Sequence, residues 1–137
     1  MTDISYTLRL EARQGYLHAR VSGPEDTVEV SMAYWLELAA ACTAAGVSRL
    51  LVVEELEGNA QPSEMAAVVE GLLQLGFHDI RVAFVDATED AALLVGAEIR
   101  VQKHGFEARV FRREDEAERW LMADGDDTAA AGSAPAA

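Results

Sequence analysis

The sequence predicts an α/β fold in which a mixed, mostly parallel sheet is flanked by four helices. Three observations carry this prediction. The chain begins with two segments in which apolar and polar residues alternate around a short turn, the pattern of an antiparallel hairpin. Compact apolar segments then recur at intervals of about 30 residues, the length of one strand–helix unit. The segments between them place apolar residues at helical spacing. The expected element order is ββαβαβαβα.

The hairpin is expected over residues 4–11 and 16–21. Apolar residues alternate with polar ones in both segments, and the turn between them contains Gly15. The sequence Ser22-Gly23-Pro24 ends the second strand. Alternation with a period of two residues predicts strands that cover the core with one face only.

The first helix is expected over residues 26–45, followed by Gly46 at a position that needs a positive φ. Its main apolar stripe consists of Val28, Met32, Trp35, Leu36, Ala39 and Cys42. A neighbouring stripe consists of Tyr34, Leu38 and Ala41. A single core-facing stripe does not need these extra residues. They either widen the buried face, contact a second subunit, or line a cavity for a hydrophobic ligand.

Three strands are expected over residues 49–53, 80–85 and 108–111. The first two are almost continuously apolar, as in strands that are covered on both faces. A second helix is marked by Met65, Val68, Val69, Leu72 and Leu73, and a third by Ala91, Leu94, Val95 and Ile99. Gly76 and Gly105 are expected to end them. A closing helix over residues 114–121 is expected to turn Ala117, Trp120 and Leu121 inward.

Composition divides the 137-residue chain into a domain over residues 1–123 and a tail over residues 124–137. Half of the residues are hydrophobic, which is enough for a core at this length. The tail has no large apolar residue and is rich in Ala and Asp, which predicts an acidic, disordered segment.

Charge and cysteine content exclude several classes of protein. The formal net charge of −13 argues against binding to nucleic acid or to an anionic membrane. The apolar runs are too short for a membrane span, so a cytoplasmic protein is expected. Cys42 is the one cysteine, which excludes an intramolecular disulfide and a cysteine-rich zinc site. Its place on the helical stripe predicts a buried structural thiol.

Five segments together carry a family resemblance. They are residues 21–24, 49–54, 80–86, 108–111 and 115–121, the last with the pattern Ala-x-x-Trp-Leu after an acidic turn. In this order they resemble the STAS or SpoIIAA-like fold of bacterial anti-sigma-factor antagonists and transporter tails, and most of all the subgroup labelled STAS/SEC14-like. The resemblance spans about residues 4–122 and implies a non-enzymatic regulatory domain.

One motif of that family is absent. Anti-sigma-factor antagonists carry an Asp-Ser-Ser-Gly-like motif, with a phosphorylated serine, at the helix after the third strand. The matching residues 54–64 lack this pattern, although Ser63 lies near the predicted helix start. Next to Pro62, Ser63 is more simply a residue of the first helical turn, where its hydroxyl accepts a hydrogen bond from an unpaired amide.

The sequence supports two functional hypotheses, which belong to different classes of protein. The first, which the family resemblance implies, is a regulatory or protein-interaction domain of a bacterial-type cytoplasmic protein. Its implied partner surface is the loop after the third strand and the start of the next helix, with Glu57, Asn59 and Ser63. A second copy of the chain is a further candidate partner. The second is a small carrier or sensor that binds an apolar ligand such as a lipid between the sheet and the helices. Its predicted lining residues are Trp35, Leu38, Met65 and Val69.

Polar residues also follow the carboxyl ends of the predicted parallel strands, where ligands bind in such sheets. Glu54, Glu55 and Asp86 form a candidate site for a divalent cation there. The alternative is that strand-end acids favour the positive ends of the following helices, as in residues 86–90 and 114–116. Thr88, Arg112 and Arg113 also follow these strands. Glu57 is the third acid after the strand over residues 49–53.

Motifs of enzymes and cofactor sites are missing. The sequence has no Gly-x-Gly-x-x-Gly, no phosphate-binding Gly-Lys-Ser/Thr loop and no Gly-x-Ser-x-Gly. Its histidines, His18, His78 and His104, do not share a metal-ligand spacing and are expected to face solvent. The sequence therefore predicts no enzymatic activity, no metal and no cofactor.

Overall fold

A computed structural model describes residues 5–58, 62–75, 77–87 and 91–123. These residues form one five-stranded sheet with the strand order β1-β2-β3-β4-β5. The strands are β1 (Thr7–Arg13), β2 (Tyr16–Gly23), β3 (Arg49–Leu56), β4 (Arg81–Val85) and β5 (Ala108–Phe111). The helices are α1 (Val28–Ala45), α2 (Pro62–Leu72), α3 (Ala91–Lys103) and α4 (Glu114–Met122), with a short 3-10 turn over Phe77–Asp79.

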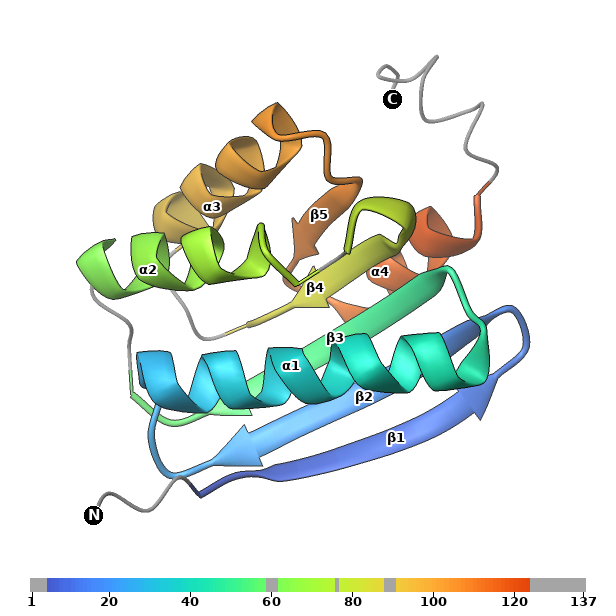
Figure 1. The fold of residues 1–137 in the computed structure, drawn as a ribbon, viewed down its shortest axis with the longest axis horizontal. Helices are drawn as coiled ribbons and strands as arrows, with labels where there is room; N and C mark the ends of the chain where they lie inside the picture. The colour runs from blue at the N-terminus through green and yellow to red at the C-terminus, as the bar shows by residue number, and fades with distance from the viewer. Residues whose placement is uncertain (1–4, 59–61, 76, 88–90, 124–137) are drawn as a thin grey trace.

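The topology confirms the predicted element order and the mixed, mostly parallel sheet. Strand β1 pairs with β2 antiparallel, and the pairs β2–β3, β3–β4 and β4–β5 are parallel. Helices α1, α2 and α3 lie side by side on one face of the sheet, and α4 lies on the other (Figure 1). The parallel pairing therefore brings the carboxyl ends of β2 to β5 to one edge of the sheet.

The first hairpin turns through two residues, Gln14 and Gly15, between the paired Arg13 and Tyr16. Gly15 has a φ of 89°, a conformation that an L side chain rarely adopts. The predicted hairpin is confirmed over β1 and β2, while Ile4 lies outside the described residues.

Helix α1 has a signal at each end. The hydroxyl of Thr27 accepts a hydrogen bond from the backbone N–H of Val30 at 3.1 Å, as in a standard N-cap. At the other end Gly46 has a φ of 69°, and its N–H donates to the carbonyl of Cys42 at 2.9 Å. The predicted carboxyl end of this helix is confirmed. The predicted start at residue 26 lies two residues before the observed start at Val28.

Two glycine-to-alanine substitutions should have opposite effects on stability. An added methyl group meets nothing within 4 Å at Gly46 or at Gly96, which lies inside α3. Gly46→Ala should lower the free energy of unfolding by about 1–2 kcal/mol, because alanine is strained at positive φ. Gly96→Ala should raise it by about 0.5–1 kcal/mol, because alanine favours the helix. Urea denaturation of both variants checks this, and two shifts of the same sign would contradict it.

The core consists of two parts on opposite faces of the sheet. The larger part lies under α1, α2 and α3, and the smaller part lies under α4. As predicted, Ala117 and Leu121 of α4 are fully buried, with Trp120 packed against them. Cys42 is buried as well, and burial raises the pKa of its thiol to about 11, as expected for an unreactive structural cysteine.

The predicted inward faces of two helices are partly wrong. Leu36 of α1 is 59% exposed, and Val95 and Ile99 of α3 are 48% and 51% exposed. Apolar residues surround much of both helices, so helical spacing alone did not identify the side that meets the sheet. The buried face of α1 consists of Val30, Ser31, Tyr34, Trp35, Leu38 and Cys42. Its second apolar stripe thus belongs mainly to a wide core face.

The expectation that His18 faces solvent is wrong. Its side chain is 4% exposed, and its Nε2 lies 2.6 Å from a carboxylate oxygen of Glu114. Strand β2 is an interior strand of the sheet, and the first turn of α4 covers this position. Arg20, two residues further along the same face, contacts the second oxygen of Glu114 at 3.0 Å. His104 is exposed as predicted, and its Nδ1 lies 3.0 Å from the carbonyl oxygen of Arg100.

Further predictions concern residues that the structure does not describe. Gly76, Thr88 and the tail over residues 124–137 lie outside the described residues. Helix α2 itself ends at Leu72, one residue before the predicted stripe ends. Within the described residues, no helix is both long and apolar enough to span a membrane.

Candidate ligand cavity at the helical face

A cavity of about 100 Å³ lies between the sheet and helices α1, α2 and α3. Its walls are mostly apolar, and they combine residues from all three helices with residues from β4 and β5. The apolar wall consists of Trp35, Met65, Val68, Val69, Leu72, Phe77, Val82, Phe84, Leu94, Ala97, Val101, Phe106, Ala108 and Val110.

Three of the four predicted ligand-binding residues line this cavity. Trp35, Met65 and Val69 belong to its wall, whereas Leu38 is fully buried in the core one turn further along α1. The indole ring of Trp35 packs against Phe77 with ring centres 5.5 Å apart and against Phe84 at 6.0 Å. All three rings line the cavity.

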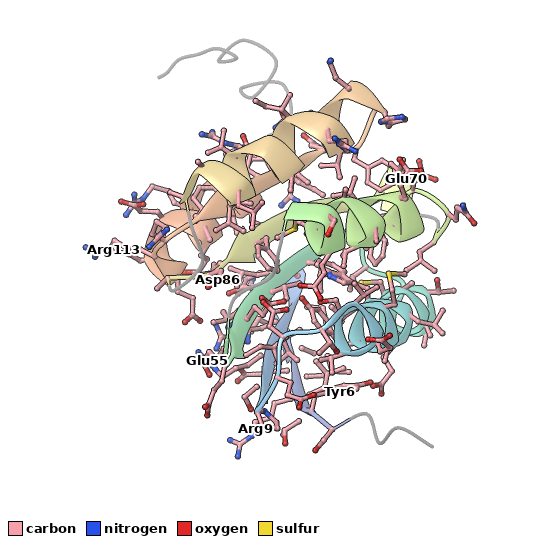
Figure 2. The ribbon with its side chains drawn as sticks, turned by 90° about the vertical axis from the view of Figure 1, so that its left-hand side faces the viewer. Tyr6, Arg9, Glu55, Glu70, Asp86 and Arg113 are labelled. Carbon is pink, nitrogen blue, oxygen red and sulfur yellow. The ribbon has the colours of Figure 1, made fainter. Side chains whose placement is uncertain are left out.

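The polar lining residues gather mainly at the end of the cavity near the carboxyl edge of the sheet. Asp26 and Thr27 precede α1, Ser31 and Tyr34 lie in its first two turns, Glu54 lies near the end of β3, and Glu64 lies in the first turn of α2. Figure 2 shows the labelled Glu55, Asp86 and Arg113 along this same edge, where neighbouring strands end.

Strand geometry determines which of the two adjacent glutamates enters the cavity. Side chains alternate between the two faces of a strand, so Glu54 points to the face of Leu50 and Val52, under α1. Glu55 points to the opposite face, where it is exposed and accepts a hydrogen bond from Arg20 at 2.7 Å. Only Glu54 therefore reaches the cavity.

Glu54 is held by two polar neighbours. The hydroxyl of Tyr34 donates a hydrogen bond to its carboxyl group. The carboxyl group of Asp86, which follows β4, also forms a hydrogen bond with it. Tyr34, Glu54 and Asp86 are 0%, 8% and 3% exposed. A contact between two carboxyl groups requires a proton on one of them.

Burial raises the pKa of Glu54 well above its ordinary value. The negative charges of Asp26 and Asp86 raise this pKa further, and the hydrogen bond from Tyr34 lowers it. Burial likewise raises the pKa of Tyr34, with a further contribution from the neighbouring Glu54. Glu54 thus retains its proton to a higher pH than an exposed glutamate does.

The predicted cation site at Glu54, Glu55 and Asp86 is wrong in one respect. Glu54 and Asp86 do meet, but Glu55 lies on the other face of the sheet. Among the residues that the structure describes, no three acidic, histidine or cysteine side chains are placed to hold a metal ion.

Two of the predicted partner-binding residues, Glu57 and Ser63, lie just beyond the same edge. Glu57 follows β3 and is exposed, and its backbone N–H donates to the carbonyl of Gly23 at 3.0 Å. Ser63 is exposed in the first turn of α2, and Asn59 lies outside the described residues. Arg113 is the residue before α4 and pairs with Asp115 at 3.0 Å. The acidic first turn of α4 agrees with the helix-dipole interpretation.

Sequence reasoning missed the polar end of the cavity. The spacing of residues in the helix places Tyr34 in an apolar stripe, and no sequence pattern marks Asp26 as a site residue. One signal was present in β3, because the alternation Leu50, Val52, Glu54 places a glutamate at a position that faces the helices. A charged residue at such a position is rarely buried without a partner.

The chain was compared with known proteins. No family model and no curated protein sequence matches it. A solved structure that does match is an anti-sigma factor antagonist from Mycobacterium paratuberculosis, with a TM-score of 0.56 and 15% sequence identity. The match covers 89% of this chain and 98% of the other. Together with the observed strand order, it confirms the predicted fold: the chain has the SpoIIAA-like STAS fold of an anti-sigma factor antagonist.

Proposed function

We propose that this chain is a non-enzymatic regulatory domain of a bacterial-type cytoplasmic protein that acts by binding a protein partner. The observation that carries this proposal is the fold shared with an anti-sigma factor antagonist over nearly the whole of both chains. The partner surface is the segment after β3 together with the start of α2, which contains Glu57, Asn59 and Ser63.

Two features support this surface. Glu57 and Ser63 are exposed on either side of the connection from β3 to α2. The same helix α2 carries Met65 and Val69 into the cavity. A partner at the start of α2 therefore contacts the element that also forms one wall of the cavity, so the two sites can influence each other.

A single charge reversal tests the surface. Glu57→Arg should reduce the amount of partner recovered with the tagged chain from its own cells by about tenfold, the effect of losing about 1.4 kcal/mol of binding free energy. Asp79→Arg is the matched control, because Asp79 is an exposed acid that precedes β4 at the opposite edge of the sheet. Quantitative mass spectrometry measures both. Equal recovery with the two variants would show that the surface lies elsewhere.

The cavity favours a second candidate function, the binding of a small apolar ligand. Its apolar walls come from three helices and two strands, which is typical of small-molecule sites. At about 100 Å³ it is smaller than the roughly 150 Å³ apolar cavity known to bind benzene. It therefore suits a group smaller than benzene, such as a short branched chain, rather than an entire long-chain lipid.

Filling the cavity tests this second function. Ala97 of α3 lines the cavity, whereas Val95 on the outer side of the same helix is 48% exposed. Ala97→Phe should abolish the binding of xenon, a small apolar probe that binds in apolar cavities, and Val95→Phe should leave it intact. Chemical-shift changes in the amide NMR spectrum report the binding. Circular dichroism confirms that both variants fold. If xenon bound equally well to both, its site would not be this cavity.

A further inference from the structure

We propose that two copies of this chain associate by pairing strand β1 of each copy in antiparallel orientation, about a two-fold axis at Leu10. The two sheets thereby join into one continuous sheet. The surface that forms this contact is the free edge of β1, and it includes neither the cavity nor the start of α2.

Strand β1 is an open edge of the sheet. It lies outermost, beside β2, and no helix lies beyond it (Figure 1). It pairs with β2 over seven consecutive residues, and six of these seven residues are exposed. Native proteins often protect such an edge with a short strand, a proline or a bulge, and β1 has none of these.

The opposite edge of the sheet, β5, is closed by side chains of α3. The N–H of Val110 donates to Oε1 of Glu98 at 2.9 Å, and the amide group of Gln102 donates to the carbonyl of Ala108 at 2.8 Å. The carbonyl of Phe111 accepts instead from the residue after β4. Helix α3 therefore occupies the backbone groups that a further strand needs. Of the two edges, β1 is the one that can be extended.

The backbone groups of β1 that point away from the sheet belong to Leu8, Leu10 and Ala12. The carbonyl of Gly23 accepts from the N–H of Glu57, so the odd-numbered residues of β2 direct their backbone groups toward β3. The even-numbered residues of β2 therefore face β1, where each lies opposite an odd-numbered residue. Within the described chain, the even-numbered residues of β1 thus have no strand to accept from or donate to.

The two faces of β1 differ in character. Leu8 packs against the core under α1, and Leu10 is 46% exposed. Successive side chains alternate between faces, so Ala12 shares this apolar face, while Arg9 and Glu11 share the other. An antiparallel partner strand therefore meets an apolar row on one face and a charged row on the other.

Charge selects one register for the pairing of β1 with its own copy. With the two-fold axis at Leu10, Arg9 of each copy lies opposite Glu11 of the other, and Leu8 lies opposite Ala12. An axis at Arg9 places this arginine opposite itself, and an axis at Glu11 places this glutamate opposite itself. Opposite charges that face each other across two strands are stabilising, and like charges are destabilising. Strand β1 is therefore complementary to itself when the axis lies at Leu10.

Both charged groups are available for this contact. Arg9 is exposed, makes no ion pair with another described residue, and lies opposite Arg20 within its own hairpin. Glu11 accepts from Arg13 of its own chain through Oε1. Its Oε2 can therefore accept from Arg9 of the second copy. The pairing relieves Arg9 of a like-charged neighbour that no acid offsets on its own strand.

Sedimentation equilibrium of the full chain at physiological salt tests the association, because this salt screens the repulsion between two acidic chains. The wild type should show a concentration-dependent equilibrium between monomer and dimer, since one strand from each copy forms a small interface. Arg9→Glu and Glu11→Arg should each raise the dissociation constant at least about tenfold, because both symmetry-related pairs become repulsive.

These two reversals change the net charge in opposite directions, so a general charge effect cannot weaken both dimers. Lys103→Glu is the matched control for Arg9→Glu. It reverses an exposed positive charge at the end of α3 and should leave the dissociation constant unchanged. Circular dichroism confirms that each variant folds.

Combining the two reversals tests the register. A mixture of the Arg9→Glu chain with the Glu11→Arg chain should form a heterodimer, because both facing positions then carry opposite charges. The double variant with Arg9→Glu and Glu11→Arg should associate with itself as tightly as the wild type. A substitution that merely disturbed β1 would not be rescued in this way.

Three outcomes would overturn the inference. The first is a wild-type chain that stays monomeric up to about 1 mM, the weak end of specific association. The second is a dimer that neither reversal weakens, which would use another surface, such as the outer side of α1 around the exposed Leu36. The third is failure of both the mixture and the double variant to associate, which would exclude the pairing of Arg9 with Glu11.

Discussion

Leu38→Ala should lower the free energy of unfolding by about 2–5 kcal/mol, the range found when a fully buried leucine is truncated. Leu38 has no exposed surface and belongs to the core under α1. The surrounding side chains come from a helix and a rigid sheet, so they cannot collapse fully into the space that the substitution leaves. Urea denaturation followed by the fluorescence of Trp35 and Trp120 measures the change.

Leu36→Ala is the matched control for this prediction, because Leu36 lies on the same helix and is 59% exposed. Its truncation should change the free energy of unfolding by less than about 0.5 kcal/mol, as is usual for surface positions. A loss at Leu36 as large as that at Leu38 would mean that the outer side of α1 is covered by a partner or a second subunit. The pair therefore also tests whether the second apolar stripe serves the core.

Glu54→Gln should make the protein more stable than the wild type at high pH and change its stability least at low pH. The pKa of Glu54 is raised in the folded state, so the folded protein retains a proton that the unfolded chain loses above its ordinary glutamate pKa. The contribution of Glu54 to wild-type stability should therefore fall as the pH rises from about 4.5 toward the folded pKa of Glu54. The slope is at most about 1.4 kcal/mol per pH unit for one proton. Glutamine keeps the shape of the protonated carboxyl group and does not titrate.

Urea denaturation across a range of pH checks this second prediction. The difference in free energy of unfolding between Glu54→Gln and the wild type should grow with pH and then level off. Glu57→Gln is the control, because it removes the same formal charge at an exposed position. A Glu54→Gln profile parallel to that of the wild type would show that Glu54 is already ionised in the folded protein, which would contradict its proposed environment.

Much of the fold followed from the sequence because its signals are local. Alternating residues around Gly15 were enough to identify the hairpin, since period-two patterning on both sides of a glycine turn is typical of an antiparallel pair. Gly46 after an apolar helix was enough to place the carboxyl end of α1. The apolar segments of β3 and β4 indicated strands covered on both faces. These features depend on backbone preferences and burial patterns that a few neighbouring residues determine.

The candidate site depended on contacts between distant segments. Trp35, Met65 and Val69 were identified as lining residues from their helical stripes, and their convergence on one cavity required three helices to pack on one face. Tyr34 and Glu54 are 20 residues apart, and their hydrogen bond exists only because α1 crosses the end of β3. His18 and Glu114 are 96 residues apart, and α4 buries His18.

What the sequence by itself determined about this protein is therefore the order and type of its elements, the antiparallel hairpin and the absence of common catalytic motifs. The tertiary structure decided which side of α1 and α3 is buried, which of two adjacent glutamates enters the cavity, and which acids meet there. The physical reason is that apolar residues surround both helices, so the direction in which each packs depends on the sheet beneath it. The chemistry of the cavity follows from that packing.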